Sequence, residues 1–94
     1  MSVKEIRWSE EKDAMLRANS TRKNVGFAEC ATAIEEGRIL DNIIHPVRQN
    51  QRIYVLEIDG YAFAVPYIYD GDALFLKTIF PSRLYTAQYL RKKQ

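Results

Sequence analysis

The chain has 94 residues and a formal net charge of +2, with 47% hydrophobic and 28% charged residues. This length allows one domain with a core of its own, and the apolar content excludes a disordered chain. A single cysteine excludes an internal disulfide, and one cysteine with one histidine makes no zinc site. Because the charged N-terminus resembles neither a signal peptide nor a membrane span, we expect a single cytoplasmic domain over residues 1–94, with no membrane partner.

The first helix is expected to begin at a serine. Residues 5–8 read as a short strand or as an ordered segment that leads into it. Ser9 is a typical N-cap, and Glu10 and Glu11 follow in the first turn, where the helix dipole favours negative charge. The helix should end near residues 19–20. Its apolar face is predicted to carry Ala14, Met15 and Ala18.

The stretch FAECATAIEEG, residues 27–37, is the clearest helix in the sequence. Its apolar residues follow the i, i+3, i+4, i+7 spacing of a single stripe. They are Phe27, Cys30, Ala31 and Ile34. Gly37 stands where a glycine commonly ends a helix. Because Cys30 lies on the stripe, we expect it to pack in the core and to play no chemical role.

From residue 38 the pattern changes to that of strands. We expect strands over residues 38–44, 53–58, 61–68 and 73–80. Asp59-Gly60 and Asp70-Gly71 are each typical of a two-residue hairpin turn. Pro66 indicates a bulge or an edge within its strand. A last helix should begin after Ser82, with Leu84, Tyr85, Tyr89 and Leu90 as its apolar residues. The order predicts an α+β fold: an antiparallel β-meander with two N-terminal helices and one C-terminal helix.

The two predicted turns set the register of the sheet and sort its side chains onto two faces. The larger, aromatic face should be covered by helices and collects Tyr54, Leu56, Ile58, Tyr61, Phe63, Val65, Tyr67, Leu74 and Leu76. The other face collects Ile53, Val55, Glu57, Ala62, Ala64, Phe75, Lys77 and Ile79. Lys77 is expected opposite Ala64 on this second face.

Lys77 and Arg83 are the candidate anion-binding pair. A lysine in the floor of a shallow sheet face and an arginine at its rim can together hold a phosphate, since arginine offers a bidentate fork and lysine a point charge. The helix that opens at Ser82 would add free backbone N–H groups near Arg83. Ordinary surface charge is the alternative, with Lys77 paired to Glu57 across the strands and Arg83 solvated.

Three segments together resemble the BrnT-like toxins of bacterial type II toxin–antitoxin modules. The first is WSEEK, where the family usually has W-D-E-x-K, and the second is GFAECATAI, where relatives have G-x-S-F-E-E-A. The third is the β-meander whose last strand runs into an arginine before the final helix. The resemblance covers nearly the whole chain, with the motifs in the same order.

The resemblance implies a compact fold of the RelE/ParE kind and a metal-independent endoribonuclease activity on messenger RNA, without a cofactor. It also implies a partner, a DNA-binding antitoxin usually encoded next to the toxin. The arginine of the family's terminal motif falls on Arg83, and Lys77 lies in the strand just before it. Within this hypothesis, both residues stabilise the charge of the phosphorane.

Other residues receive roles under the same hypothesis. His45 is the candidate for proton transfer at neutral pH. Tyr85 and Tyr89 are candidates for positioning a base or donating a proton, although their i, i+4 spacing equally indicates a packing pair. The flanking RNA backbone would be held by Arg48, Arg52 and Arg91. The alternative is a non-catalytic partner protein that works through a complex with a DNA-binding repressor, using the apolar surface around Ile53, Val55, Phe75 and Ile79.

Overall fold

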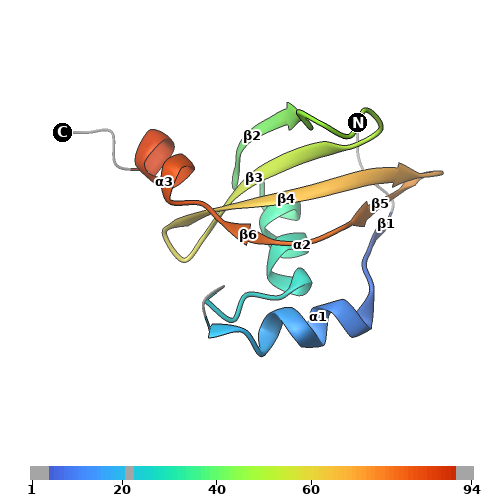
Figure 1. Ribbon diagram of the computed structural model, residues 1–94, viewed down its shortest axis with the longest axis horizontal. Coiled ribbons are helices and arrows are strands. Elements are labelled where there is room, and N and C mark those ends of the chain that lie inside the picture. Colours follow the sequence, from blue (N-terminus) through green and yellow to red (C-terminus); the bar gives the residue numbers. More distant parts are fainter. Residues whose placement is uncertain (1–4, 21–22, 91–94) are drawn as a thin grey trace.

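The structure, a computed structural model, describes residues 5–20 and 23–90 (Figure 1). In that part of the chain three helices accompany a six-stranded mixed sheet, which makes the fold α+β. The strands are β1 (Glu5–Arg7), β2 (Ile39–Ile44), β3 (Arg52–Ile58), β4 (Tyr61–Asp70), β5 (Ala73–Leu76) and β6 (Phe80–Pro81). The helices are α1 (Glu10–Arg17), α2 (Phe27–Glu35) and α3 (Arg83–Leu90). None of the helices within these described ranges is long and apolar enough to cross a membrane.

The predicted antiparallel meander is confirmed for β2 to β5, in the spatial order β1-β5-β4-β3-β2. The sheet as a whole is nevertheless mixed, because residues 5–7 form a strand that pairs with β5 in parallel, with Ile6 beside Leu74. Such a pairing joins segments almost seventy positions apart in the chain, so no local turn signal announces it.

The first hairpin has the predicted register. Tyr54 lies opposite Val65, and Leu56 lies opposite Phe63. Asp59 and Gly60 have φ angles of +55° and +76°, so both central residues are left-handed, as a type I′ turn requires. Aspartate tolerates this conformation better than most residues with a side chain, and glycine adopts it without strain.

The second turn is one residue later than predicted. Asp70 pairs with Ala73, so Gly71 and Asp72 form the turn, and Gly71 takes the left-handed φ of +63°. Tyr67 therefore lies opposite Leu76, where the predicted register placed Val65. This slip is of two residues, and side chains alternate with period two, so the core face keeps its membership.

The predicted strand 73–80 is interrupted. It ends at Leu76 and resumes as β6, where Phe80 lies opposite Ala64. At the break, the N–H of Lys77 donates to the carbonyl of Pro66 at 2.8 Å, and Lys77 faces Pro66 instead of Ala64. Pro66 has no N–H to donate in return, so the regular ladder cannot continue past it.

The break changes which face the following side chains occupy. Leu76 lies opposite Tyr67, and Phe80 lies opposite Ala64. The pairing register therefore shifts by one residue across the break, and the alternation of side chains between the two faces is reversed. Ile79, predicted on the open face, is fully buried in the core. Phe80 is 44% exposed on the open side instead.

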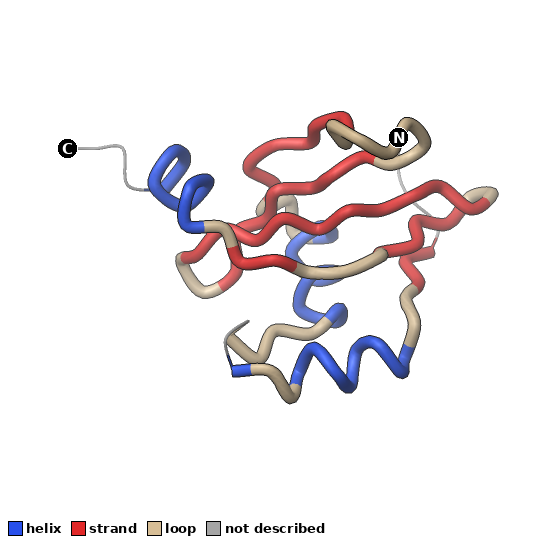
Figure 2. The backbone as a smooth tube through the Cα atoms, in the orientation of Figure 1, coloured by secondary structure: helices blue, strands red, loops and turns tan. Residues whose placement is uncertain are grey.

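The core lies between one face of the sheet and the first two helices (Figure 2). Phe27 and Cys30 are fully buried on α2, as predicted, with Ala33 in place of the half-buried Ala31. Gly37 ends this helix with a φ of +78°, and the N–H of Arg38 reaches back to the carbonyl of Ala33 at 2.8 Å. The sheet contributes Tyr54, Leu56, Ile58, Phe63, Val65, Tyr67, Leu74 and Leu76, and the segment between β5 and β6 adds Ile79.

The first helix packs differently from the prediction. Ser9 caps it as expected, accepting from the N–H of Lys12 at 3.2 Å. Its buried residue is Leu16, whereas Ala14, Met15 and Ala18 are exposed. Polar contacts set this orientation, because Asp13 and Arg17, on the same side as Leu16, bind the start of α2.

The last helix covers one end of the open face, the face opposite α2. The side chain of Ser82 caps it, as predicted, by accepting from the N–H of Tyr85 at 3.0 Å. Thr86 is buried, and its hydroxyl accepts from the N–H of Ala62 at 2.8 Å. In Figure 1, α3 stands at the far left end of β4, so the right part of the open face stays clear of helices.

Candidate functional site

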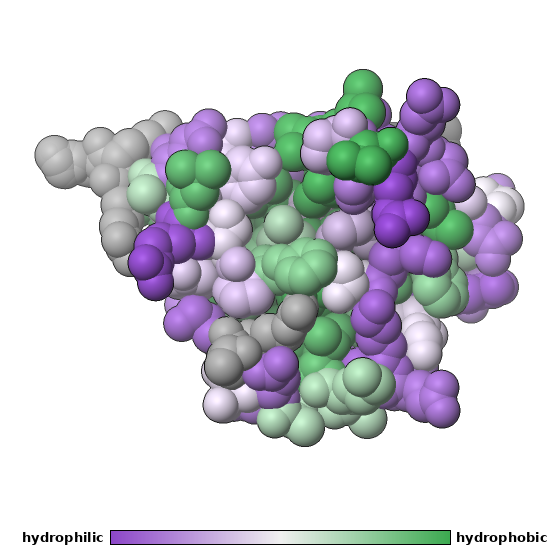
Figure 3. Space-filling model, in the orientation of Figure 1, coloured by the Kyte–Doolittle hydropathy of each residue, from purple (hydrophilic) through white to green (hydrophobic). Residues whose placement is uncertain are grey.

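A groove of about 640 Å³ lies on the open face, where the β2–β3 loop and the segment after β5 approach β4. Figure 3 views this face and shows hydrophilic side chains in a band beside a central hydrophobic group. The groove is lined by Lys12, His45, Val47, Arg48, Gln51, Pro66, Lys77, Thr78 and Phe80.

The charge of the groove is one-sided. Lys12, Arg48 and Lys77 line it, and none of its described lining residues carries a carboxylate. The three cations come from α1, from the β2–β3 loop and from the segment after β5, so only the tertiary fold brings them together. A concave surface with cations of one sign attracts and concentrates anions.

Lys77 lies on the open face, as predicted, although its environment differs from the prediction. Its ammonium nitrogen is 5.5 Å from the centre of the Phe75 ring, a cation–π distance. Glu57, its partner in the surface-charge alternative, instead accepts from the N–H of Gly60 at 2.7 Å. The half-buried Lys77 thus presents its charge to the groove.

His45 follows β2 and lies in the same groove. Its backbone N–H donates to the carbonyl of Gln51 at 3.1 Å. Its ring nitrogen Nδ1 accepts from the N–H groups of Val47 and Arg48, each at 3.1 Å. Through these two hydrogen bonds the imidazole holds the turn of the β2–β3 loop.

Arg83, Tyr85 and Tyr89 belong to α3 and do not line the groove. Arg83 is exposed at the start of the helix. The rings of Tyr85 and Tyr89 are 6.0 Å apart, which makes them a packing pair. The hydroxyl of Tyr89 donates to Asp41 on β2, and this hydrogen bond is the main cause that raises the tyrosine's pKa and lowers the pKa of Asp41.

The three predicted RNA-binding arginines fall in different places. Arg48 lines the groove. Arg52 lies opposite Tyr67, a residue of the core-facing side, and its guanidinium binds Asn42, with Nε 3.0 Å from the side-chain oxygen. Arg91 lies outside the described residues. Of the eight predicted site residues, the structure therefore brings His45, Arg48 and Lys77 into one groove.

Sequence reasoning missed several groove residues. Lys12, the lysine of the WSEEK segment, was given no role, and Thr78 carried no motif. Phe80 was predicted within a continuous strand whose alternation the structure breaks. The proline in β4 was the one available signal for that break. The apolar surface of the non-catalytic alternative is also corrected, because Val55 and Ile79 are fully buried.

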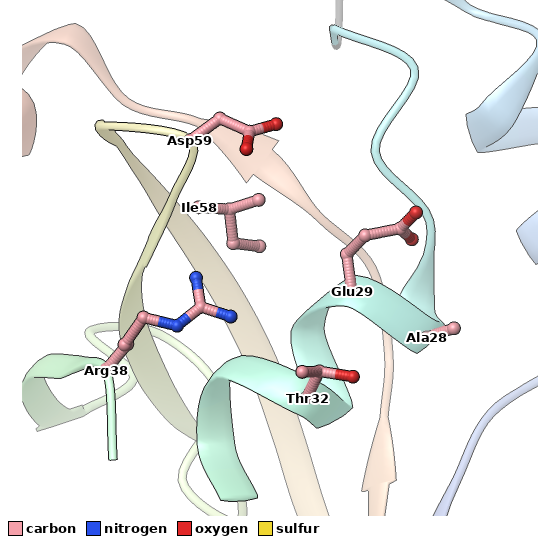
Figure 4. A pocket seen from close by; sticks show the side chains of 6 residues that line it. All are labelled: Ala28, Glu29, Thr32, Arg38, Ile58 and Asp59. Carbon is pink, nitrogen blue, oxygen red and sulfur yellow. The ribbon is translucent and has the colours of Figure 1, made fainter. Parts of the chain in front are cut away.

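A second, smaller cavity of about 260 Å³ lies between α2 and the β3–β4 turn (Figure 4). Arg38 points into it, but its guanidinium already donates to the carbonyl of Glu57 at 2.9 Å and pairs with Glu36 at 3.0 Å. Glu29 turns away toward Arg17, at 2.8 Å. This cavity is the weaker candidate, because it is smaller and because its arginine and its glutamate are already paired.

Comparison of the chain with protein-family models, with curated proteins and with solved structures finds no match.

Proposed function

We propose that the chain is the toxin component of a bacterial toxin–antitoxin system and that it cleaves messenger RNA without a metal ion. The RelE/ParE-like identity of the fold and a cognate DNA-binding antitoxin, encoded next to the chain, are part of this proposal. Two independent observations support it: the sequence motifs that resemble BrnT-like toxins, and the groove. The groove carries the argument, because its three cations face no carboxylate among the described lining residues.

RNA is the polyanion that this groove suits. Its backbone carries one negative charge per nucleotide, and lysine and arginine side chains bind such a backbone by charge and by hydrogen bonds. A groove that combines these cations with Phe80 and Pro66 offers both charged and apolar contacts to a nucleotide.

The proposed chemistry depends on charge stabilisation. Metal-free cleavage moves negative charge onto the phosphorane, and cations fixed beside it lower the barrier. In this proposal Lys77 and Arg48, which line the groove, provide these cations. In this proposal Arg83, exposed at the start of α3, holds the flanking RNA strand.

Controlled expression in bacteria tests the function. The wild type, expressed from a tight promoter, should arrest growth and fragment transcripts, whereas Lys77→Gln should restore both growth and transcript integrity. Lys23→Gln is the charge-matched control, since Lys23 lies 4.4 Å above the ring of Tyr61 and does not line the groove. Normal growth with intact transcripts for the wild type would overturn the ribonuclease proposal.

The same experiment addresses the non-catalytic alternative. A partner protein without nuclease activity would leave transcripts intact, yet its complex with an adjacent DNA-binding protein would still bind operator DNA. A gel-shift assay of the co-expressed pair measures that binding directly.

A further inference from the structure

The hydrogen bonds of His45 assign a proton to one of its ring nitrogens. Nδ1 accepts two backbone N–H groups, from Val47 and Arg48, both at 3.1 Å. A nitrogen that accepts a hydrogen bond carries no proton, so the proton of the neutral ring is on Nε2. The lone pair of Nδ1 is occupied by the loop, and Nε2 is a donor.

This arrangement does not suit a proton-transfer group. A general base needs a free lone pair within reach of the proton that it removes. Neither nitrogen of His45 offers one while the loop keeps its conformation. What the side chain does provide is a fixed turn at residues 46–48, and that turn places Arg48 in the groove with Lys77.

We propose that His45 is a positioning residue of a phosphate-binding site: Nδ1 fixes the loop that presents Arg48, and Arg48, Lys77 and the Nε2–H of His45 bind the RNA backbone. The identity of the ligand as RNA rests on the proposed function. The role of Nδ1 rests only on the geometry of the loop.

Asparagine separates the two roles of the ring. The side-chain oxygen of asparagine occupies nearly the same position as Nδ1 and can accept the same two N–H groups, but it cannot transfer a proton at neutral pH. His45→Asn therefore keeps the loop contact and loses Nε2–H, whereas His45→Ala loses both. The difference between these two variants reports the contribution of Nδ1 alone.

RNA affinity is measured by fluorescence anisotropy with a short 2′-O-methyl RNA oligonucleotide, which binds but is not cleaved. We expect His45→Ala to bind about tenfold more weakly than His45→Asn, the scale of one lost charge-assisted contact. In an Arg48→Ala background the two variants should bind equally, because His45 acts through Arg48. A difference that persists in that background would overturn the proposal.

Cleavage of the unmodified oligonucleotide gives a second readout. We expect His45→Asn to lower kcat/KM by up to about tenfold, because it loses the one neutral hydrogen bond from Nε2–H to the RNA backbone. We expect His45→Ala to raise KM. If both variants abolish kcat equally while KM stays unchanged, His45 transfers a proton and the positioning role is wrong.

A measurement without RNA keeps the two proposals distinguishable. In amide NMR spectra, the Val47 and Arg48 signals of His45→Asn should stay close to their wild-type positions, and those of His45→Ala should move. If both variants shift these signals alike, the loop does not depend on Nδ1. If a wild type with intact loop signals neither binds nor cleaves RNA, the proposed function fails, while the role of Nδ1 in the loop is still decided by these spectra.

Discussion

The hydroxyl of Tyr89 on α3 donates a hydrogen bond to the carboxylate of Asp41 on β2, 48 residues earlier in the chain. The second oxygen of Asp41 accepts from the backbone N–H of Asn42 at 2.8 Å. One carboxylate thus fastens the last helix to the edge strand of the sheet, across the open face. Tyr89, a catalytic candidate in the sequence, has a structural role here.

Tyr89→Phe should lower the melting temperature, and the loss should depend on pH. The hydrogen bonds from Tyr89 and Asn42 lower the pKa of Asp41, so its stabilisation is present above the ordinary value of 3.8 and is lost as the pH falls through the lowered value. The bond to Asp41 raises the pKa of Tyr89, so on the alkaline side stabilisation is lost as the pH rises through the raised value, above 10.0.

Thermal unfolding of the wild type and of Tyr89→Phe, measured from acid to alkaline pH, checks this expectation. Tyr85→Phe is the matched control, one turn earlier on the same helix, because its hydroxyl makes no hydrogen bond within the described part of the chain. Equal melting temperatures for the wild type and Tyr89→Phe at neutral pH would contradict the role of the bond.

Lys77→Gln should reduce the salt dependence of RNA binding. Each cation that contacts a phosphate releases about one counterion, so the slope of log K against log salt should fall by about 1. Lys23→Gln changes the net charge by the same amount away from the groove and should leave the slope unchanged. Affinity titrations at several salt concentrations measure both slopes. Equal slopes for the two variants would show that the RNA does not use the groove.

Glu29→Gln should weaken the fold most at neutral pH. Burial acts to raise the pKa of Glu29, but hydrogen bonds from Arg17 and from the backbone of Glu29 and Gly26 outweigh it, and the pKa is lowered. The carboxylate therefore stabilises the fold above its ordinary pKa of 4.5, and this stabilisation disappears as the pH falls through the lowered value. Melting temperatures are measured from neutral to acid pH. The difference between the wild type and Glu29→Gln should be largest at neutral pH and should disappear in acid, whereas the exposed control Glu35→Gln should not show this change.

Gly26→Ala should destabilise the protein through Arg17. A Cβ atom at position 26 would lie 2.3 Å from the guanidinium carbon of Arg17, so that side chain must move away from Glu29. The cost should be about 1 kcal/mol, at the lower end for overpacking, since a flexible side chain can yield. Urea denaturation of the variant in wild-type and Arg17→Ala backgrounds measures it. A similar loss in both backgrounds would place the strain elsewhere.

Cys30→Ser should cost about 1–3 kcal/mol, because it buries a hydroxyl in an apolar site. The thiol of Cys30 is fully buried, and burial, with smaller contributions from Glu29 and Asp13, raises its pKa to about 12. In the native protein the thiol should therefore react very slowly with a disulfide reagent, and fast only in denaturant. Rapid labelling under native conditions would mean that this part of α2 opens.

The sequence by itself determined the local features of the fold, which depend on residues close together in the chain. The caps at Ser9 and Ser82, the helix α2 with its final Gly37 and the turn at Asp59-Gly60 each depend on a few consecutive residues, and the structure confirms them. The stripe of α2 is confirmed at Phe27 and Cys30, whereas Ala33 is buried in place of Ala31. The faces of β3 and β4 followed from that one turn, because alternation carries a local register along two strands.

Only the tertiary structure decided where the chain departs from its local pattern. Pro66 on β4 ends the pairing with β5 after Leu76, ten residues later in the chain. As a result Ile79 turns inward and Phe80 outward. One groove is bordered by a loop, a broken strand and a helix from separate parts of the chain, and these bring Arg48, Lys77 and Lys12 to its lining. Pairings between distant segments have no local sequence signal, since they depend on how the whole core packs. The charge that the proposed function needs was visible in the sequence, but the surface that gathers it was not.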